Sequence, residues 1–108
     1  MSTFGFLAGR TRRIRFVTQV LVLGYHHPLE IAKRYGTLDT VSRGRVTLGV
    51  GVGSLREDFD LLGVEFDGRG DRAEDALRAL RASLSVSESD YEGTHYRFGG
   101  LIVEPCAV

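Results

Sequence analysis

Two short apolar runs, with a helical segment between them, constrain this chain more than any other feature of its sequence. The first run, residues 14–23 (IRFVTQVLVL), is rich in β-branched residues and almost continuously apolar. The second, residues 45–52 (RVTLGVGV), has a similar character. Strands that are buried on both faces show this pattern and occur mainly in parallel sheets covered by helices, so the runs predict an α/β fold.

The segment between the runs is predicted to be a helix. Pro28 stands where the first helical turn tolerates proline, and Gly44 suits the end of a helix. Apolar side chains recur on one stripe between them, at Leu29, Ala32, Tyr35, Leu38 and Val41. Residues 14–52 are therefore predicted to form a strand, a helix and a second, parallel strand joined by a right-handed crossover.

The rest of the chain is predicted to surround this unit. Helices are expected over residues 2–10, 55–62 and 71–84, and the last should expose Arg72, Asp75, Arg78 and Arg81 on its polar side. A two-residue turn at Gly99-Gly100 is predicted to join strands in residues 91–98 and 101–103. The sequence shows no repeat or linker, so residues 1–108 are predicted to form a single domain.

Composition excludes several classes of protein. Of the 108 residues, 43% are hydrophobic and 26% are charged, and the net charge is zero, as in ordinary globular proteins. No apolar run approaches the roughly 18 residues of a membrane span, and the N-terminal basic residues follow the short apolar run, the reverse of a signal peptide. Because Cys106 is the only cysteine, no internal disulfide can form, and we expect a cytoplasmic protein without a membrane partner.

A basic cluster lies near the N-terminus, at Arg10, Arg12, Arg13 and Arg15. Guanidinium groups in this number can contact phosphates, but the cluster lacks the interleaved aromatic side chains of a nucleic-acid surface. Acidic residues elsewhere balance its charge, so no nucleic-acid partner is expected.

Glycine occupies every second position from Gly49 to Gly53. A dinucleotide-binding fingerprint is excluded because its third glycine would fall on Ser54 or Arg56, and no Lys-Ser/Thr pair supports a P-loop. In a strand, the alternation places Val46, Leu48, Val50 and Val52 on the helix-facing side and Thr47 with the three glycines on the other. The bare side leaves room for a neighbouring backbone or for a planar ligand, and the spacing alone leaves both open.

Residues that could carry chemistry are sparse. His26 and His27 are adjacent and would point apart, and His95 and Cys106 lie far along the chain, so no metal site is predicted. The adjacent histidines follow the first strand, where barrel active sites are built, and could line such a site. No residue is nominated as catalytic, since neither a Ser-His-Asp order nor a nucleophile elbow occurs.

Three phrases of the sequence together resemble one enzyme family. They are the strand that ends before His27-Pro28, the phrase TLDTVSRGRVTLGVGVG followed by REDFDLLGVEF, and the closing YEGTHYRFGGLIVEP. This combination is similar to the luciferase-like monooxygenases, the bacterial luciferase family that includes deazaflavin-dependent oxidoreductases. The resemblance implies a TIM (β/α)8 barrel that binds FMN or the deazaflavin coenzyme F420 at the carboxyl ends of its strands. Residues 14–23 would be the third barrel strand and residues 45–52 the fourth.

The resemblance also implies which residues meet the cofactor. In such proteins a cis peptide bond at the end of the third strand contacts the ring system, and the matching bond here is Gln19-Val20, preceded by Thr18. At the end of the fourth strand, the positions beside the edge of the ring are Gly51, Val52 and Gly53. Some family members place an asparagine, cysteine or arginine there, so this chain is expected to supply polar contacts from its backbone.

The length of the chain predicts an incomplete barrel. A complete barrel takes about 250 residues, and this chain has 108. It is therefore expected to supply only strands three and four, their helices and a C-terminal hairpin, as an incomplete domain. The predicted function is a fragment of a flavin- or deazaflavin-dependent oxidoreductase or monooxygenase, transferring hydride or activating oxygen on a small organic substrate. The alternative is a non-catalytic chain, because open strand edges favour a homo-oligomer or a partner that completes the sheet.

Overall fold

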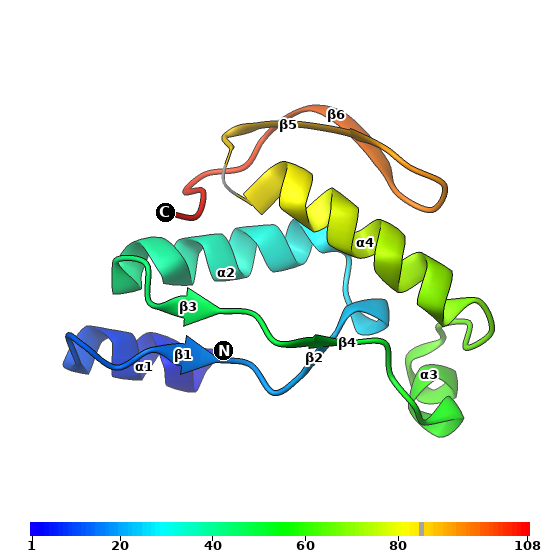
Figure 1. Cartoon of the computed structure of the whole chain (residues 1–108), viewed down its shortest axis with the longest axis horizontal. Coiled ribbons are helices and arrows are strands. Elements are labelled where there is room, and N and C mark those ends of the chain that lie inside the picture. Colours follow the sequence, from blue (N-terminus) through cyan, green and yellow to red (C-terminus); the bar gives the residue numbers. More distant parts are fainter. Residues whose placement is uncertain (85) are drawn as a thin grey trace.

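The computed structural model describes residues 1–84 and 86–108, and Figure 1 shows their course. The helices are α1 (Ser2–Arg10), the short 3-10 helix η1 (Leu23–Tyr25), α2 (Pro28–Ser42), α3 (Arg56–Leu62) and α4 (Arg69–Leu84). The strands are β1 (Phe16–Val17), β2 (Leu21–Val22), β3 (Val46–Thr47), β4 (Val50–Gly51), β5 (Glu88–Glu92) and β6 (Arg97–Ile102). The predicted helices around the central unit are confirmed as α1, α3 and α4. In these two ranges no helix combines the length and apolarity that crossing a membrane requires.

Each apolar run forms two very short strands in place of one long strand. β1 pairs in parallel with β3, and β2 pairs in parallel with β4, with Phe16 opposite Val46 and Leu21 opposite Val50. Parallel pairing across α2 confirms the predicted strand, helix and strand unit. The pairing stops between the two short strands of each run, so the expectation of continuous strands is wrong there.

The core lies between the strands and two helices. α2 lies along the strands, α4 packs against α2, and the hairpin of β5 and β6 lies outside α4 (Figure 1). The main cluster of buried side chains contains Leu23, Ile31, Ala32, Ala73, Ala76, Leu80 and Val103. Leu48 and Val50 pack against it, as predicted for the apolar side of the second run. Val41 is 58% exposed, so its place in the predicted stripe of α2 is wrong, and the last turn buries Ser42 instead.

The C-terminal hairpin forms, but its turn is not at Gly99-Gly100. β5 and β6 are antiparallel with Glu92 opposite Arg97, so the turn occupies residues 93–96. Gly100 lies within β6 at a φ of 64°, opposite a register shift at Asp90. The Asp90 carboxylate accepts a hydrogen bond from the Gly100 N–H at 2.9 Å. The two glycines therefore serve a bulge inside the strand, and the sequence pattern does not distinguish a bulge from a turn.

Asp75 is buried, although the helical pattern places it on the polar side of α4. The residue is only 6% exposed, because the hairpin packs over this side of the helix. Its carboxylate accepts hydrogen bonds from the Tyr91 hydroxyl and from the N–H groups of His95 and Tyr96, the last two at 2.7 and 3.0 Å. A Cβ atom on Gly93 would lie 2.2 Å from the same carboxylate, so the turn fits closely around it.

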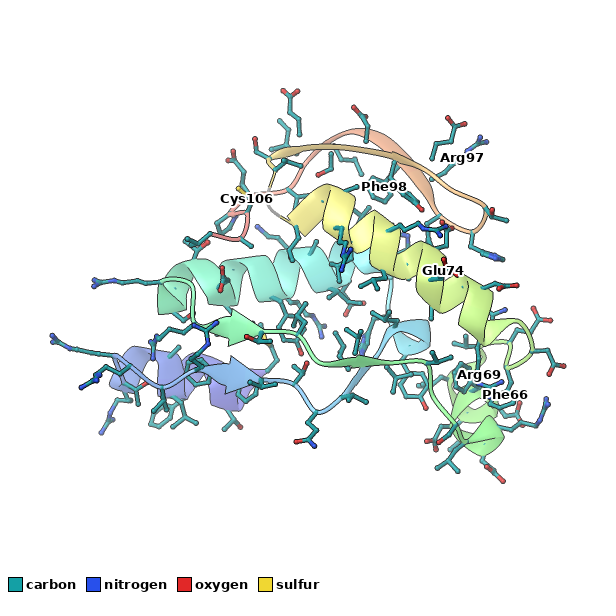
Figure 2. The ribbon with its side chains drawn as sticks, viewed as in Figure 1. Phe66, Arg69, Glu74, Arg97, Phe98 and Cys106 are labelled. Carbon is teal, nitrogen blue, oxygen red and sulfur yellow. The ribbon has the colours of Figure 1, made fainter. Side chains whose placement is uncertain are left out.

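We expect Asp75→Asn to weaken the attachment of the hairpin to α4. The NH2 group of asparagine would face the Tyr91 hydroxyl or the N–H groups of His95 and Tyr96, which are donors themselves. Each buried donor left without an acceptor costs about 1–3 kcal/mol. Urea unfolding followed by circular dichroism would measure this loss of unfolding free energy. Glu74→Gln is the matched control, because it removes the same charge from an exposed position of α4 (Figure 2) and should cost about 0.5 kcal/mol or less. Equal losses in both variants would contradict the anchoring role.

Stability should also depend on acid through Asp75. The hydrogen bond from Tyr91 lowers the pKa of Asp75 in the folded state. Burial acts in the opposite direction, and the N–H groups of His95 and Tyr96 lower the pKa further. Such a carboxyl contributes stability above its unfolded pKa, near 4, and loses it as the pH falls through the lower folded value. In parallel urea titrations from about pH 6 to pH 2, the unchanged chain should lose more unfolding free energy than Asp75→Asn. Identical pH profiles would refute this account.

Candidate functional site

Two chain segments meet where the parallel pairing is interrupted. One is residues 18–20, between β1 and β2, and the other is residues 48–49, between β3 and β4. A Cβ atom on Gly49 would lie 2.2 Å from the carbonyl oxygen of Thr18, a backbone atom that cannot rotate aside. The close approach of a neighbouring backbone, one of the two explanations left open for the alternating glycines, is therefore confirmed at this position.

The Thr18 hydroxyl replaces part of the backbone ladder at this interruption. It donates a hydrogen bond to the Gly49 carbonyl at 2.8 Å and accepts one from the Gly49 N–H at 2.9 Å. Backbone bonds resume on either side, from the Thr18 N–H to the Thr47 carbonyl at 3.3 Å and from the Leu21 N–H to the Gly49 carbonyl at 2.8 Å. One side chain thus holds the two interrupted runs together.

The six residues predicted to meet a cofactor lie on two adjoining segments, Thr18, Gln19 and Val20 on one and Gly51, Val52 and Gly53 on the other. The bond between Gln19 and Val20 is cis, as the resemblance implies. A Cβ atom on Gly51 would lie 2.9 Å from the Val20 side chain, so the segments touch there. Val20 is 55% exposed and Val52 is 42% exposed. The expected helix-facing position of Val52 is wrong, because β4 ends at Gly51 and the strand alternation ends with it.

Beyond β4, the chain turns around a buried aromatic ring. Gly53 has a φ of 92°, and a Cβ atom there would lie 2.7 Å from the ring of Phe59, a residue that is 0% exposed. Arg69 donates from Nε to the Gly53 carbonyl at 2.8 Å, and its guanidinium lies 3.7 Å from the ring centre of Phe66. Figure 2 shows Phe66 and Arg69 together at the start of α4. No spacing rule in the sequence links Arg69 to Gly53, so this contact is not predicted from the sequence.

The two adjacent histidines have structural contacts at the start of α2. His27 caps the helix, since its Nδ1 accepts a hydrogen bond from the Leu29 N–H at 3.1 Å. Its ring also packs edge-on against Tyr96, with 5.3 Å between ring centres. His26 Nδ1 lies 3.8 Å from a carboxylate oxygen of Glu30. These contacts account for both side chains without a ligand.

Titratable groups near the strand ends do not form an evident acid and base pair. Tyr25 in η1 follows β2, and its hydroxyl donates to the Asp58 carboxylate at 3.4 Å. Burial, and then the Asp58 carboxylate, raises the pKa of Tyr25, so the phenol stays protonated at neutral pH. Across the two described ranges, no three His, Cys, Asp or Glu side chains gather closely enough to hold a metal ion. The strand ends instead present apolar side chains and bare backbone, which suit a flat and largely apolar group.

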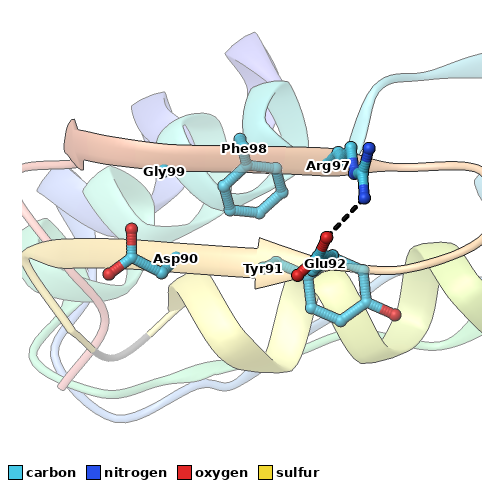
Figure 3. A pocket seen from close by; sticks show the side chains of 6 residues that line it. All are labelled: Asp90, Tyr91, Glu92, Arg97, Phe98 and Gly99. Carbon is cyan, nitrogen blue, oxygen red and sulfur yellow. Dashed lines mark hydrogen bonds and ion pairs between the residues drawn. The ribbon is translucent and has the colours of Figure 1, made fainter.

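A separate hollow lies on the hairpin. Its volume is about 540 Å³, and it is lined by Asp90, Tyr91, Glu92, Arg97, Phe98 and Gly99 (Figure 3). Arg97 pairs with Glu92, and the rings of Tyr91 and Phe98 lie 5.9 Å apart between centres. Because these charged groups already pair with one another and Asp90 binds the backbone, the hollow has a structural explanation.

The chain is similar in sequence to known monooxygenases. The family model described as luciferase-like monooxygenase matches residues 1–107. A 4-hydroxyprotoasukamycin monooxygenase of Streptomyces nodosus subsp. asukaensis is 42% identical over 81 residues, which cover 75% of this chain and 22% of that protein. Limonene 1,2-monooxygenase of Rhodococcus erythropolis is 39% identical over 84 residues, with the same two coverages of 75% and 22%.

Solved structures share the fold. Monooxygenase RslO1 from Streptomyces bottropensis has a TM-score of 0.89 at 30% identity, covering 98% of this chain and 32% of that one. The oxygenating constituent of 3,6-diketocamphane monooxygenase of Pseudomonas putida, solved with FMN, has a TM-score of 0.77 at 22% identity and coverages of 89% and 27%. The coenzyme F420 dependent tetrahydromethanopterin reductase of Methanopyrus kandleri scores 0.80 at 22% identity, with coverages of 98% and 34%. The chain thus spans 22% to 34% of the length of these proteins.

We expect Thr18→Val to destabilise the junction of the two runs. Valine keeps the branched shape but removes the hydroxyl, which leaves the Gly49 N–H without its partner and should cost about 1–3 kcal/mol of unfolding free energy. Thr18→Ser retains the hydroxyl and should stay within about 1 kcal/mol of the unchanged chain. Urea unfolding of the three proteins tests this, and equal stability of Thr18→Val and the unchanged chain would argue against it.

Proposed function

The chain belongs to the luciferase-like monooxygenase family, and from this premise we propose that it forms one cofactor-facing wall of an oxidoreductase that uses FMN or coenzyme F420. In TIM barrels, ligands bind at the carboxyl ends of the strands. Residues 1–108 would supply two adjacent barrel strands and their helices, in keeping with coverage of 22% to 34% of the matched proteins. The substrate would be a small organic molecule.

The observation that carries the proposal is the exposed apolar surface of Val20, which directly precedes β2, and of Val52, which directly follows β4. A Cβ atom on Gly51 would lie 2.9 Å from the Val20 side chain, so a larger residue at this position would crowd the surface. A planar ring could lie flat against it, with polar contacts from the backbone. We therefore assign the cofactor contacts to the six residues Thr18, Gln19, Val20, Gly51, Val52 and Gly53.

Each part of this wall would have a different task. The cofactor itself supplies the redox chemistry, either hydride transfer or activation of oxygen. Val20 and Val52 would exclude water from one face of the ring. Thr18 and Arg69 hold the two segments in place through Gly49 and the Gly53 carbonyl, so that they would keep the wall in one geometry.

A non-catalytic chain is the less favoured alternative, because the similar proteins described above are named as monooxygenases and one as a reductase. Open strand edges still favour pairing with a second copy or with a partner that completes the sheet. Size-exclusion mass measured with and without cofactor would show whether such pairing accompanies binding.

Cofactor titration tests the proposal. FMN and F420 are added separately to the purified chain while cofactor fluorescence is followed, and Val20→Asp should raise the Kd of the bound cofactor at least about tenfold, because it puts a charge where the ring would lie. Val86→Asp is the matched control, since Val86, between α4 and β5, is 47% exposed against 55% for Val20 and lies outside the proposed site. Binding of neither cofactor, or equal weakening by both variants, would overturn the proposal.

A further inference from the structure

We propose that the amino ends of β1 and β3 carry a second binding site, for a small molecule with two or more linked phosphate groups. The charge of the chain is strongly segregated. Residues 1–45 contain eight basic and two acidic side chains, whereas residues 46–108 contain six basic and twelve acidic ones. The net charge of zero therefore hides an excess of six positive charges in the first part and six negative charges in the second.

A hollow of about 610 Å³ lies within the basic part. It is formed where α1 and α2 end and where β1 and β3 begin, at the left of Figure 1. Its polar lining comes from Arg10, Thr11, Arg12, Ser42, Arg43 and Arg45, and none of its lining residues is acidic. Four guanidinium groups thus surround one hollow that no carboxylate lines.

Helix ends account for two of these arginines, Arg10 in the last turn of α1 and Arg45. The carbonyl ends of helices attract cations, so arginines could be present there for that reason alone. Arg45, however, already serves this role, because it donates to the carbonyls of Ala8, Ile14 and Ser42 at 2.9, 3.1 and 2.6 Å. It also donates to the Thr11 hydroxyl at 2.9 Å. These three carbonyls therefore have a donor without Arg12 or Arg43.

Arg12 and Arg43 are left over for a ligand. Both side chains are exposed, and across residues 1–84 and 86–108 neither makes an ion pair or a side-chain hydrogen bond. Two guanidinium groups kept together without a counter-charge repel each other, and a bound anion relieves this repulsion. The planar guanidinium fork also matches phosphate oxygens with paired hydrogen bonds.

The same features select the kind of anion. Because four guanidinium groups line the hollow, linked phosphates can engage several of them at once, whereas a single phosphate can engage fewer. The volume of about 610 Å³ exceeds what one phosphate ion fills. No aromatic side chain lines the hollow, so the base stacking that single-stranded nucleic acid uses is not offered, and a small molecule fits better.

Pyrophosphate titration by calorimetry tests the site. Arg12→Gln and Arg43→Gln should each raise the Kd for pyrophosphate about tenfold, and inorganic phosphate should bind at least about tenfold more weakly than pyrophosphate. Arg13→Gln is the matched control, because Arg13 is exposed, adjacent to Arg12 and outside the lining, and it should change the Kd less than about twofold. Circular dichroism of each variant would check that it folds.

Three results would overturn the proposal. Absence of pyrophosphate binding at low salt would remove the site. An equal rise in the Kd for pyrophosphate in Arg13→Gln would show that the overall positive charge of the cluster attracts the anion, without a defined pocket. Tighter binding of a single-stranded oligonucleotide than of pyrophosphate would assign the arginines to nucleic acid.

Discussion

The contact between the Thr18 carbonyl and Gly49 is the constraint on which the arrangement of the strands depends. The two backbones approach so closely that a Cβ atom on Gly49 would lie 2.2 Å from the Thr18 oxygen. Regular pairing cannot continue through such a point, so each run divides into two short strands and the Thr18 hydroxyl binds both polar groups of Gly49. Gly51 and Gly53 also leave no room for a Cβ atom, because the side chains of Val20 and Phe59 lie beside them. The close approach at Gly49 therefore explains the broken strands, and three separate contacts explain the alternation of glycine.

Two buried carboxylates attach the outer elements to this centre. Asp39 is 7% exposed, and it accepts hydrogen bonds from the N–H groups of Val46 and Val108 at 3.1 and 2.9 Å. Asp75 does the same for the turn of the hairpin. In both cases a carboxylate on a helix accepts hydrogen bonds from N–H groups of a neighbouring segment. The periphery is thus held by specific polar contacts, in addition to the apolar core between α2 and α4.

Periodicity predicts the helices and the parallel unit, because these depend on local spacing and on which side of each element is apolar. It fails at Asp75 and at Gly99-Gly100, where burial and conformation depend on the hairpin register and on what packs over α4. The cis bond at Gln19-Val20 follows from family resemblance, since no spacing rule predicts it. Arg69 could not be predicted at all, because its contact with Gly53 exists only once the chain has turned around Phe59.

The two ends of the strands differ in chemistry, and their separation lets them act independently. From Phe16 to Val20 the run rises by at most about 13 Å, at about 3.3 Å per residue. This distance exceeds one Debye length at physiological ionic strength, so salt screens much of the potential that the exposed arginines add at the apolar wall. What binds at the apolar wall therefore depends on shape, on exposed valine side chains and on backbone groups. The excess of positive charge acts only on ligands that reach the other end.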